Sequence, residues 1–193
     1  MNVGQYMHRD PVTVLPDASL GEAKRVMEEN GFGILLVATA EQALKGFITK
    51  GSLKTVTDWE KPVGEACFAA NFSVGPTDTL EKATLILLAN RLVLLPVVEE
   101  GRLVGVITQS EILRGLARGL GIGLAGTRLM VKVRPDSDDL YSVVGVLREY
   151  GVKLVSLAQG EKKDGYQEVI LRVQGIKDKE ALKKALESAL RRE

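Results

Sequence analysis

Residues 95–108 read LPVVEEGRLVGVIT, two apolar runs separated by a short polar turn that contains Gly101. The runs predict strands at 94–98 and 103–108. A glycine between them is typical of a tight hairpin, because glycine accepts a positive φ. A related apolar pattern occurs earlier, at 35–49. The hairpin is therefore the first sign that one unit of this sequence occurs twice.

The repeat covers the first two-thirds of the chain. Equivalent residues lie 60 positions apart up to Val37 and 59 positions apart from Leu44 onward. A fixed period of this size indicates one duplicated supersecondary unit. Two such units that face each other form a pseudo-twofold cleft, where a small molecule can bind. The matched pairs are Val3 and Val63, Gly4 and Gly64, Val14 and Val74, Pro16 and Pro76, Leu20 and Leu80, Ala23 and Ala83, Asn30 and Asn90, Leu35 and Leu95, Val37 and Val97, Leu44 and Leu103, Gly46 and Gly105, Ile48 and Ile107, and Thr49 and Thr108.

Each copy is predicted to run strand, helix, strand, strand and helix. Ser19 and Glu22 have the spacing of a capping box, and Asn30-Gly31 ends the helix that they begin. Copy 1 is expected to have strands at 12–14, 34–37 and 46–49 and a short helix to about residue 56. Copy 2 is expected to have strands at 72–74, 94–98 and 103–108 and helices at 79–90 and 110–120.

A different unit follows the repeats. Four glycines within residues 119–126 predict a linker. Beyond it, strands at 129–133, 152–158 and 166–173, a helix at 139–150, a turn at 159–164 and a last helix from 178 give the order β-α-β-β-α. This order is ferredoxin-like without the usual fourth strand, and an unfilled sheet edge tends to find a partner. The prediction is an α/β (α+β) protein with repeats at 1–60 and 61–120, a linker at 121–126 and a further domain at 127–193.

The composition favours an ordinary globular protein. Apolar residues make up 45% and charged residues 26%, and the net charge of +1 gives no overall attraction to nucleic acid or to an acidic membrane. The apolar runs are too short to span a bilayer, and the N-terminus lacks a signal-peptide pattern. Cys67 is the only cysteine, which excludes an intramolecular disulfide. We therefore expect a cytoplasmic protein that binds neither nucleic acid nor membrane.

The hairpin at 95–108 and its second copy resemble the CBS module, the regulatory repeat of cystathionine β-synthase. The unit at about 127–191 resembles an ACT domain, an amino-acid-sensing fold. The order and length of the whole resemble the acetoin-utilisation B-type proteins. The resemblance implies a regulatory sensor: CBS pairs of this kind bind adenosyl ligands such as AMP, ADP, ATP or S-adenosylmethionine, and ACT units commonly bind amino acids, often at a dimer interface.

The resemblance also implies two candidate clefts. In CBS modules a Thr or Ser follows the glycine-containing strand, and an Asp three residues later binds the ribose hydroxyls. Here the Asp is replaced by Glu111 in copy 2, which keeps a carboxylate, and by Ser52 in copy 1, which offers one hydroxyl. By the family's cross-repeat arrangement, the Glu111 cleft would consist of Val12, Phe32, Gly33, Ile107, Thr108 and Glu111. The Ser52 cleft, ranked second, would consist of Phe72, Leu92, Val93, Ile48, Thr49 and Ser52.

Plainer interpretations exist for the same residues. Thr108 and Glu111 also form a capping box that would stabilise its helix without a ligand. Phe32 and Gly33 can equally be a core side chain and a close-packed backbone position. If a nucleotide binds, the helix N-terminus after Thr108 favours its phosphate, and three side chains are unranked phosphate partners. These are His8, Lys50 and Arg114.

The ACT-like unit offers weaker signals. Asp138 occupies the loop position where ACT domains usually carry the glycine of a Pro-Gly pair, so the close backbone approach is lost. Asp138 is then a partner for an amino group or a helix N-cap. We favour a dimerisation role for this unit over amino-acid binding.

No enzymatic activity is expected. One histidine and one cysteine do not form a typical zinc site, no imidazole–nucleophile pair is indicated, and phosphate-binding loop motifs are missing. The prediction is a non-catalytic sensor that requires no cofactor and takes an adenine nucleotide as regulatory ligand. Its further partners would be a second copy in a homodimer, an amino acid as the weaker alternative, and an unknown regulated protein. The rival hypothesis is a structural or interaction module that has lost its ligands.

Overall fold

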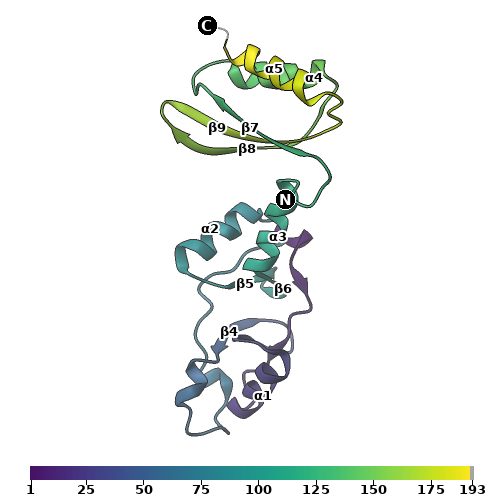
Figure 1. The fold of residues 1–193 in the computed structure, drawn as a ribbon. Coiled ribbons are helices and arrows are strands. Elements are labelled where there is room, and N and C mark those ends of the chain that lie inside the picture. Colours follow the sequence, from purple (N-terminus) through teal and green to yellow (C-terminus); the bar gives the residue numbers. More distant parts are fainter. Residues whose placement is uncertain (192–193) are drawn as a thin grey trace. The chain divides into compact units, whose positions relative to one another are not determined.

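The computed structural model describes residues 1–191 of the 193-residue chain. The chain divides into two compact units, Met1–Gly115 and Leu116–Glu193 (Figure 1). The first unit holds the two sequence repeats, and the second holds a separate three-stranded sheet with two helices. Within the described residues, no helix is both long enough and apolar enough to cross a bilayer.

The two repeats share a helix followed by a hairpin, and they differ in the elements before and after these. Copy 1 has β2 (Thr13–Val14), α1 (Leu20–Asn30), β3 (Ile34–Ala38), β4 (Leu44–Thr49) and a 3-10 helix (Ser52–Thr55). Copy 2 has α2 (Leu80–Asn90), β5 (Leu94–Glu99), β6 (Arg102–Thr108) and α3 (Gln109–Gly119). Both hairpins, β3–β4 and β5–β6, shift register at the same repeat position, between Val37 and Ala38 and between Val97 and Val98. The duplication seen in the sequence therefore extends to the register of the hairpin strands.

The segments that lead into the two repeats are exchanged between them. β1 (His8–Arg9), ahead of copy 1, pairs with β6 of copy 2. The 3-10 helix Val63–Glu65 opens copy 2, and Phe68 just after it pairs with Phe47 in β4 of copy 1. The same reciprocity holds further back, where Gly4 N–H donates to the carbonyl of Pro76 and Gly64 N–H donates to that of Pro16, both at 2.8 Å. The exchange holds the two copies face to face.

Each helix of the pair begins at a hydroxyl cap, and the cap at Ser19 was predicted from the sequence. The Ser19 hydroxyl accepts from the N–H of Glu22 at 3.2 Å, and Thr79 does the same for Lys82 in copy 2. Leu20, Ala23 and Met27 of α1 are buried against Leu35 and Ile48 of the sheet. The predicted strand at 72–74 is wrong in extent, because only Val74 bridges, to Val97. Residues 71–73 ahead of Val74 are exposed and belong to no strand.

The two repeat helices end differently. α1 ends at Gly31 with φ 69°, whereas α2 ends at Arg91 with φ 52°, and a left-handed backbone costs a non-glycine residue about 1 kcal/mol. We therefore expect Arg91→Gly to raise the free energy of unfolding by about 0.5–1 kcal/mol, measured by urea denaturation. The matched control is Gly31→Ala, which should lower the free energy of unfolding by a similar amount. A Cβ at Gly31 would meet nothing within 4 Å, so only the left-handed backbone opposes alanine there. Loss of stability in Arg91→Gly would contradict the strain argument.

The second unit has the element order β-α-β-β-α. Its elements are β7 (Thr127–Val133), α4 (Asp139–Glu149), β8 (Lys153–Lys163), β9 (Tyr166–Gln174) and α5 (Lys179–Leu190). The strands form an antiparallel sheet in the order β7-β9-β8, and both helices cover one face of it (Figure 1). Its core contains Val143 and Leu147 of α4, Leu171 of β9, and Leu182 of α5.

The predicted turn at 159–164 is wrong. β8 continues to Lys163, and the chain turns at Asp164 and Gly165, both with positive φ. The second half of β8 is polar because it is an exposed edge strand, and a register shift between Gln159 and Lys162 interrupts the alternation that would have revealed it.

Candidate functional site

The carboxylate of Glu111 lies in the first turn of α3, and the residue is only 4% exposed. Its Oε2 accepts a hydrogen bond from the backbone N–H of Thr108 at 3.3 Å and a second from the Thr108 hydroxyl. Its Oε1 lies 3.0 Å from Nε2 of His8 and 3.9 Å from a guanidinium nitrogen of Arg114. Both oxygens of Glu111 therefore already have partners in the protein.

This arrangement holds Glu111 in its charged form. Burial opposes ionisation, but the hydrogen bond from Thr108 and the neighbouring His8 outweigh it, so the pKa of Glu111 lies below its ordinary value. Thr108 in turn accepts from the N–H of Ser110 at 3.2 Å. The capping interpretation of Thr108 and Glu111 is thus realised, with Glu111 returning to the N–H of Thr108.

The other side of the Glu111 cleft is more open. Val12 is 44% exposed, and Phe32 packs against the core of its own repeat. The carbonyl of Gly33 accepts from the N–H of Lys50 at 2.9 Å. A Cβ at Gly33 would meet nothing within 4 Å, so the interpretation of Gly33 as a close-packed backbone position is wrong.

In the Ser52 cleft, the hydroxyls of Thr49 and Ser52 each hydrogen-bond to the backbone of the other residue. The Ser52 hydroxyl donates to the carbonyl of Thr49 at 2.8 Å, and the N–H of Ser52 donates to Oγ1 of Thr49 at 3.0 Å. This local ring closes the turn between β4 and the following 3-10 helix. Thr49 lies directly opposite Ile34 in the β3–β4 register.

A cavity of about 170 Å³ is lined by three of the residues predicted for the Ser52 cleft, but not by Ile48, Thr49 or Ser52. Phe72, Leu92 and Val93, all predicted for this cleft from copy 2, line it together with strand residues of copy 1. Phe72 is 41% exposed and Val93 51% exposed, so large apolar side chains stand at an accessible wall. The copy 1 side is formed by Ile34, Leu36 and Phe47, and the remaining lining residues are Ala70, Asn71, Arg91, Leu94 and Pro96.

Two predicted site residues do not present side chains to a ligand. Ile48 is 1% exposed and Ile107 is fully buried, each in the core of its own hairpin. Only their backbone can contact a bound molecule. The predicted phosphate partners also separate: His8 and Arg114 contact Glu111, whereas Lys50 lines a different pocket with Lys54 and Trp59.

Two residues that line the cavity, one from each repeat, were not predicted from the sequence. Phe47 and Arg91 line the cavity, yet neither belongs to the motif that follows the hairpin. The available signal was the comparison of the copies, because Phe47 stands where copy 2 has Val106 and Arg91 stands where copy 1 has Gly31. Likewise His8 corresponds to Phe68, so one cleft carries the His8–Glu111 contact where the other carries the Phe47–Phe68 ring contact, with centroids 5.7 Å apart.

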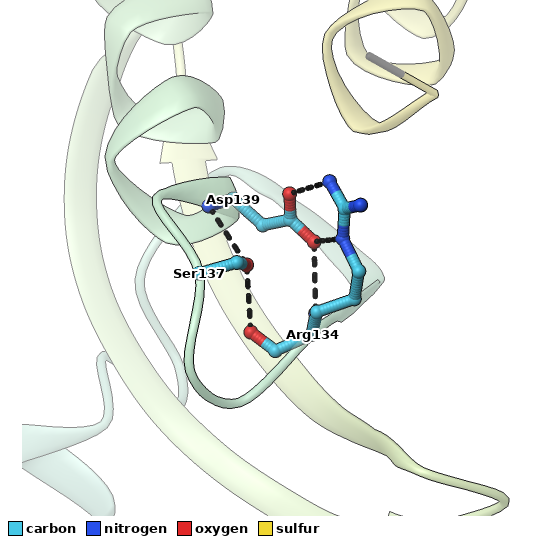
Figure 2. A network of polar contacts seen from close by, with 3 residues as sticks. All are labelled: Arg134, Ser137 and Asp139. Atoms are coloured by element: carbon cyan, nitrogen blue, oxygen red, sulfur yellow. Dashed lines mark hydrogen bonds and ion pairs between the residues drawn. The ribbon is translucent and has the colours of Figure 1, made fainter. Parts of the chain in front are cut away.

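In the second unit, an amino acid would bind at the loop of residues 134–139. The side chains of this loop hydrogen-bond to one another and to the loop backbone. Figure 2 shows the guanidinium of Arg134 gripping the carboxylate of Asp139, with Nε to Oδ2 at 3.0 Å and Nη2 to Oδ1 at 2.8 Å. The Ser137 hydroxyl accepts from the N–H of Asp139 at 3.2 Å and donates to the carbonyl of Arg134. Asp138 occupies the N-cap position, but its side chain makes no capping hydrogen bond, so that predicted role is wrong.

Residues 1–191 contain no group of three His, Cys, Asp or Glu side chains arranged to hold a metal ion.

Comparison with known proteins assigns the repeats. Residues 3–56 and 63–118 match the CBS domain family, more than half of the chain. A curated relative, inosine-5'-monophosphate dehydrogenase of Methanocaldococcus jannaschii, is 36% identical over 107 residues, 55% of this chain. The chain spans only 22% of the length of that enzyme.

Solved structures agree with this assignment. A putative acetoin utilization protein (AcuB) from Vibrio cholerae is 26% identical with a TM-score of 0.58, covering 63% of this chain and 94% of its own. A CBS domain pair/ACT domain protein from Thermotoga maritima is 26% identical with a TM-score of 0.57, covering 62% and 99%. CBSX2 in complex with AMP is 25% identical with a TM-score of 0.55, covering 61% and 96%. With its duplicated hairpins, exchanged lead-in segments and this match over both repeats, the chain belongs to the CBS domain family.

Proposed function

We propose that the protein is a non-catalytic regulatory sensor whose CBS pair binds an adenine nucleotide, with the base in the cavity of the Ser52 cleft. The observation that carries the proposal is the apolar cavity between the repeats, with exposed Phe72 and Val93 on one wall and Phe47 on the other. A flat heteroaromatic base suits such walls. A CBS relative, CBSX2, was solved with AMP.

Arg91 supplies the charge that a phosphate needs. It lines the same cavity and adopts a left-handed backbone conformation where the equivalent residue of copy 1 is glycine. Strain of this kind is retained at functional sites when the side chain has a use. A guanidinium binds phosphate oxygens in a bidentate manner, so we assign Arg91 to the phosphate.

The Glu111 cleft is the second candidate. A ribose there must compete for a carboxylate whose oxygens already accept from Thr108 and face His8. The order of the two clefts in this proposal therefore reverses the order that the motif chemistry alone suggests. The sugar in the Ser52 cleft would lie toward Thr49, which adjoins Ile34 of the cavity wall.

The test is isothermal titration of AMP, ADP, ATP and S-adenosylmethionine into the wild type and four variants. We expect Phe72→Ala to weaken binding about tenfold, because contact between a base and an aromatic ring is worth about 1–3 kcal/mol. Arg91→Gly should weaken the binding of AMP, ADP and ATP but not that of S-adenosylmethionine, which carries no phosphate. Glu111→Gln should change affinity less than about twofold. The matched control is Leu85→Ala, an apolar residue of α2 that is 68% exposed.

Two outcomes would contradict the proposal. Binding lost in Glu111→Gln and kept in Phe72→Ala would assign the ligand to the Glu111 cleft. No saturable binding of any of the four ligands would support the rival hypothesis, an interaction module that has lost its ligands.

For the second unit we propose an ACT-like domain, with the ferredoxin-like order β-α-β-β-α, that holds a homodimer together. The solved relative from Thermotoga maritima combines a CBS pair with an ACT domain. Sensing of an amino acid is the alternative role, and the Arg134–Asp139 pair disfavours it by filling the loop. The domains proposed are 1–60, 61–120 and 127–193 with a linker at 121–126. Sedimentation velocity with and without a panel of amino acids distinguishes the two roles.

A further inference from the structure

A groove runs along the second unit between the outer edge of β7 and the helix α5. Its volume is about 580 Å³. The strand contributes Leu129 and Val131 to its lining, and the helix contributes Leu182, Leu186 and Leu190. The groove is thus a mainly apolar slot roofed by α5, beside the strand where the sheet ends.

The edge of β7 lacks the features by which proteins usually protect an exposed strand. Its pairing with β9 is unbroken from Thr127 to Val133. β8, at the opposite edge, has two register shifts, and bulges of this kind discourage further pairing. Among the described residues, no strand pairs with the outer edge of β7, so its backbone donors and acceptors on that side remain available to an added strand.

A second copy of β7 is disfavoured in this slot. α5 lines the groove beside β7, so a second copy paired along that edge would bring its own α5 next to this one. Charge disfavours the pairing as well. In the symmetric register centred on Met130, Arg128 of each copy would lie opposite Lys132 of the other, and like charges directly opposite are destabilising. The slot therefore suits a single strand that carries no helix of its own.

The outer face of β7 indicates the charge of that strand. Arg128, Met130 and Lys132 are all exposed on the face away from the helices. Lys132 lies opposite Glu168 in β9, but Arg128 lies opposite Arg172, so one end of this face carries two neighbouring positive charges. At the rim of the groove, Lys179 and Lys183 of α5 add positive charge and Glu180 and Glu187 add negative charge, so with Lys132 and Arg191 the lining stays net positive. An acidic side chain opposite Arg128 would relieve this repulsion.

We propose that the groove binds an extended acidic segment of a partner protein as a fourth strand of the sheet. Alternate apolar side chains of the segment face α5, and acidic side chains lie next to Arg128. The backbone of β7 supplies the hydrogen bonds, as in other cases of strand addition. This interaction is independent of the nucleotide, so its failure would leave the proposed function of the CBS pair unaffected.

The test uses the full-length chain and a blocked nine-residue peptide of alternating glutamate and valine. Residue-resolved amide hydrogen exchange should show slower exchange at Thr127–Val133 on peptide addition, with no change along β8. A peptide of alternating lysine and valine should give at least about tenfold weaker protection. A glutamate–valine peptide with proline at its centre should bind poorly, since proline removes a ladder donor.

Charge reversal provides the matched pair of variants. Arg128→Glu should weaken the binding of the glutamate–valine peptide about tenfold and strengthen the binding of the lysine–valine peptide. Lys153→Glu, an exposed change at the opposite edge of the sheet, should alter neither. Protection of β7 that rises with protein concentration in the absence of peptide would overturn the proposal in favour of a second copy. Equal or absent binding of the two charged peptides would overturn it as well.

Discussion

Gly46→Ala is expected to lower the free energy of unfolding of the CBS pair by about 3 kcal/mol. A Cβ at this position would lie 2.2 Å from the carbonyl oxygen of Phe68 and 3.2 Å from Sγ of Cys67. That carbonyl cannot withdraw freely, because it accepts from the N–H of Phe47 at 2.9 Å while the N–H of Phe68 donates back at 2.8 Å. Moving Phe68 away to relieve the overlap would therefore break both hydrogen bonds between Phe68, in the lead-in of copy 2, and Phe47 of β4.

The equivalent substitution in copy 2 should be milder. At Gly105 a Cβ would meet the carbonyl oxygen of His8 at 2.7 Å and Sδ of Met7 at 2.9 Å, and the flexible Met7 side chain can move. We expect Gly105→Ala to cost about 2 kcal/mol. Gly51→Ala is the control, because φ there is −65° and its Cβ would meet only a side-chain atom at 3.6 Å. Trp59, the only tryptophan, reports unfolding of this unit by fluorescence in urea. Equal stabilities of Gly46→Ala and Gly51→Ala would contradict the crossing argument.

These two glycines show what the sequence could reveal about the fold. Their recurrence identified the duplication, and capping and periodicity placed α1, α2 and the hairpins within a few residues of their observed ends. The reason for glycine was not visible, because it depends on Phe68 and His8, which come from the lead-in of the other repeat. Contacts of this kind join segments far apart in sequence, and no local pattern encodes them.

The candidate site divides in the same way. Motif spacing led to Thr108 and Glu111, which do lie together, but the burial of Glu111 and its pairing with His8 depend on β1 joining β6. Phe72, Leu92 and Val93 were named from the family's arrangement, and the opposing wall at Phe47 emerged only from the fold. Local chemistry could thus nominate residues, whereas their availability to a ligand is decided by what else contacts them.

Asp139→Asn is expected to destabilise the second unit by about 1.5 kcal/mol at pH 7. The hydrogen bond from the Arg134 side chain is the main cause that lowers the pKa of Asp139 from 3.8 to about 2, assisted by the Arg134 backbone N–H and opposed by burial. The full shift would correspond to a larger energy, but the Arg134 side chain is 44% exposed, and solvent screens the pair. Asparagine keeps the shape of the side chain and loses the charge, both toward Arg134 and toward the N-terminus of α4.

The pH dependence identifies the cause. Because the pKa of Asp139 is lower in the folded than in the unfolded chain, its stabilisation is complete above pH 3.8 and is lost as the pH falls toward 2. The difference between wild type and Asp139→Asn should therefore be constant from pH 7 to about 5 and shrink below pH 4. Urea denaturation followed by the NMR signal of the Leu171 amide, which is buried in this unit, measures the stability of the unit at each pH.

Asp138→Asn separates this pair from a general effect of negative charge at the start of α4. Asp138 precedes the helix by one residue and its side chain makes no capping hydrogen bond, so we expect a change below about 0.5 kcal/mol. A similar loss in both variants would mean that the helix dipole, and not the Arg134 contact, stabilises the loop. A difference for Asp139→Asn that persisted unchanged to pH 3 would contradict the assignment, because its effect would then not depend on the ionisation of Asp139.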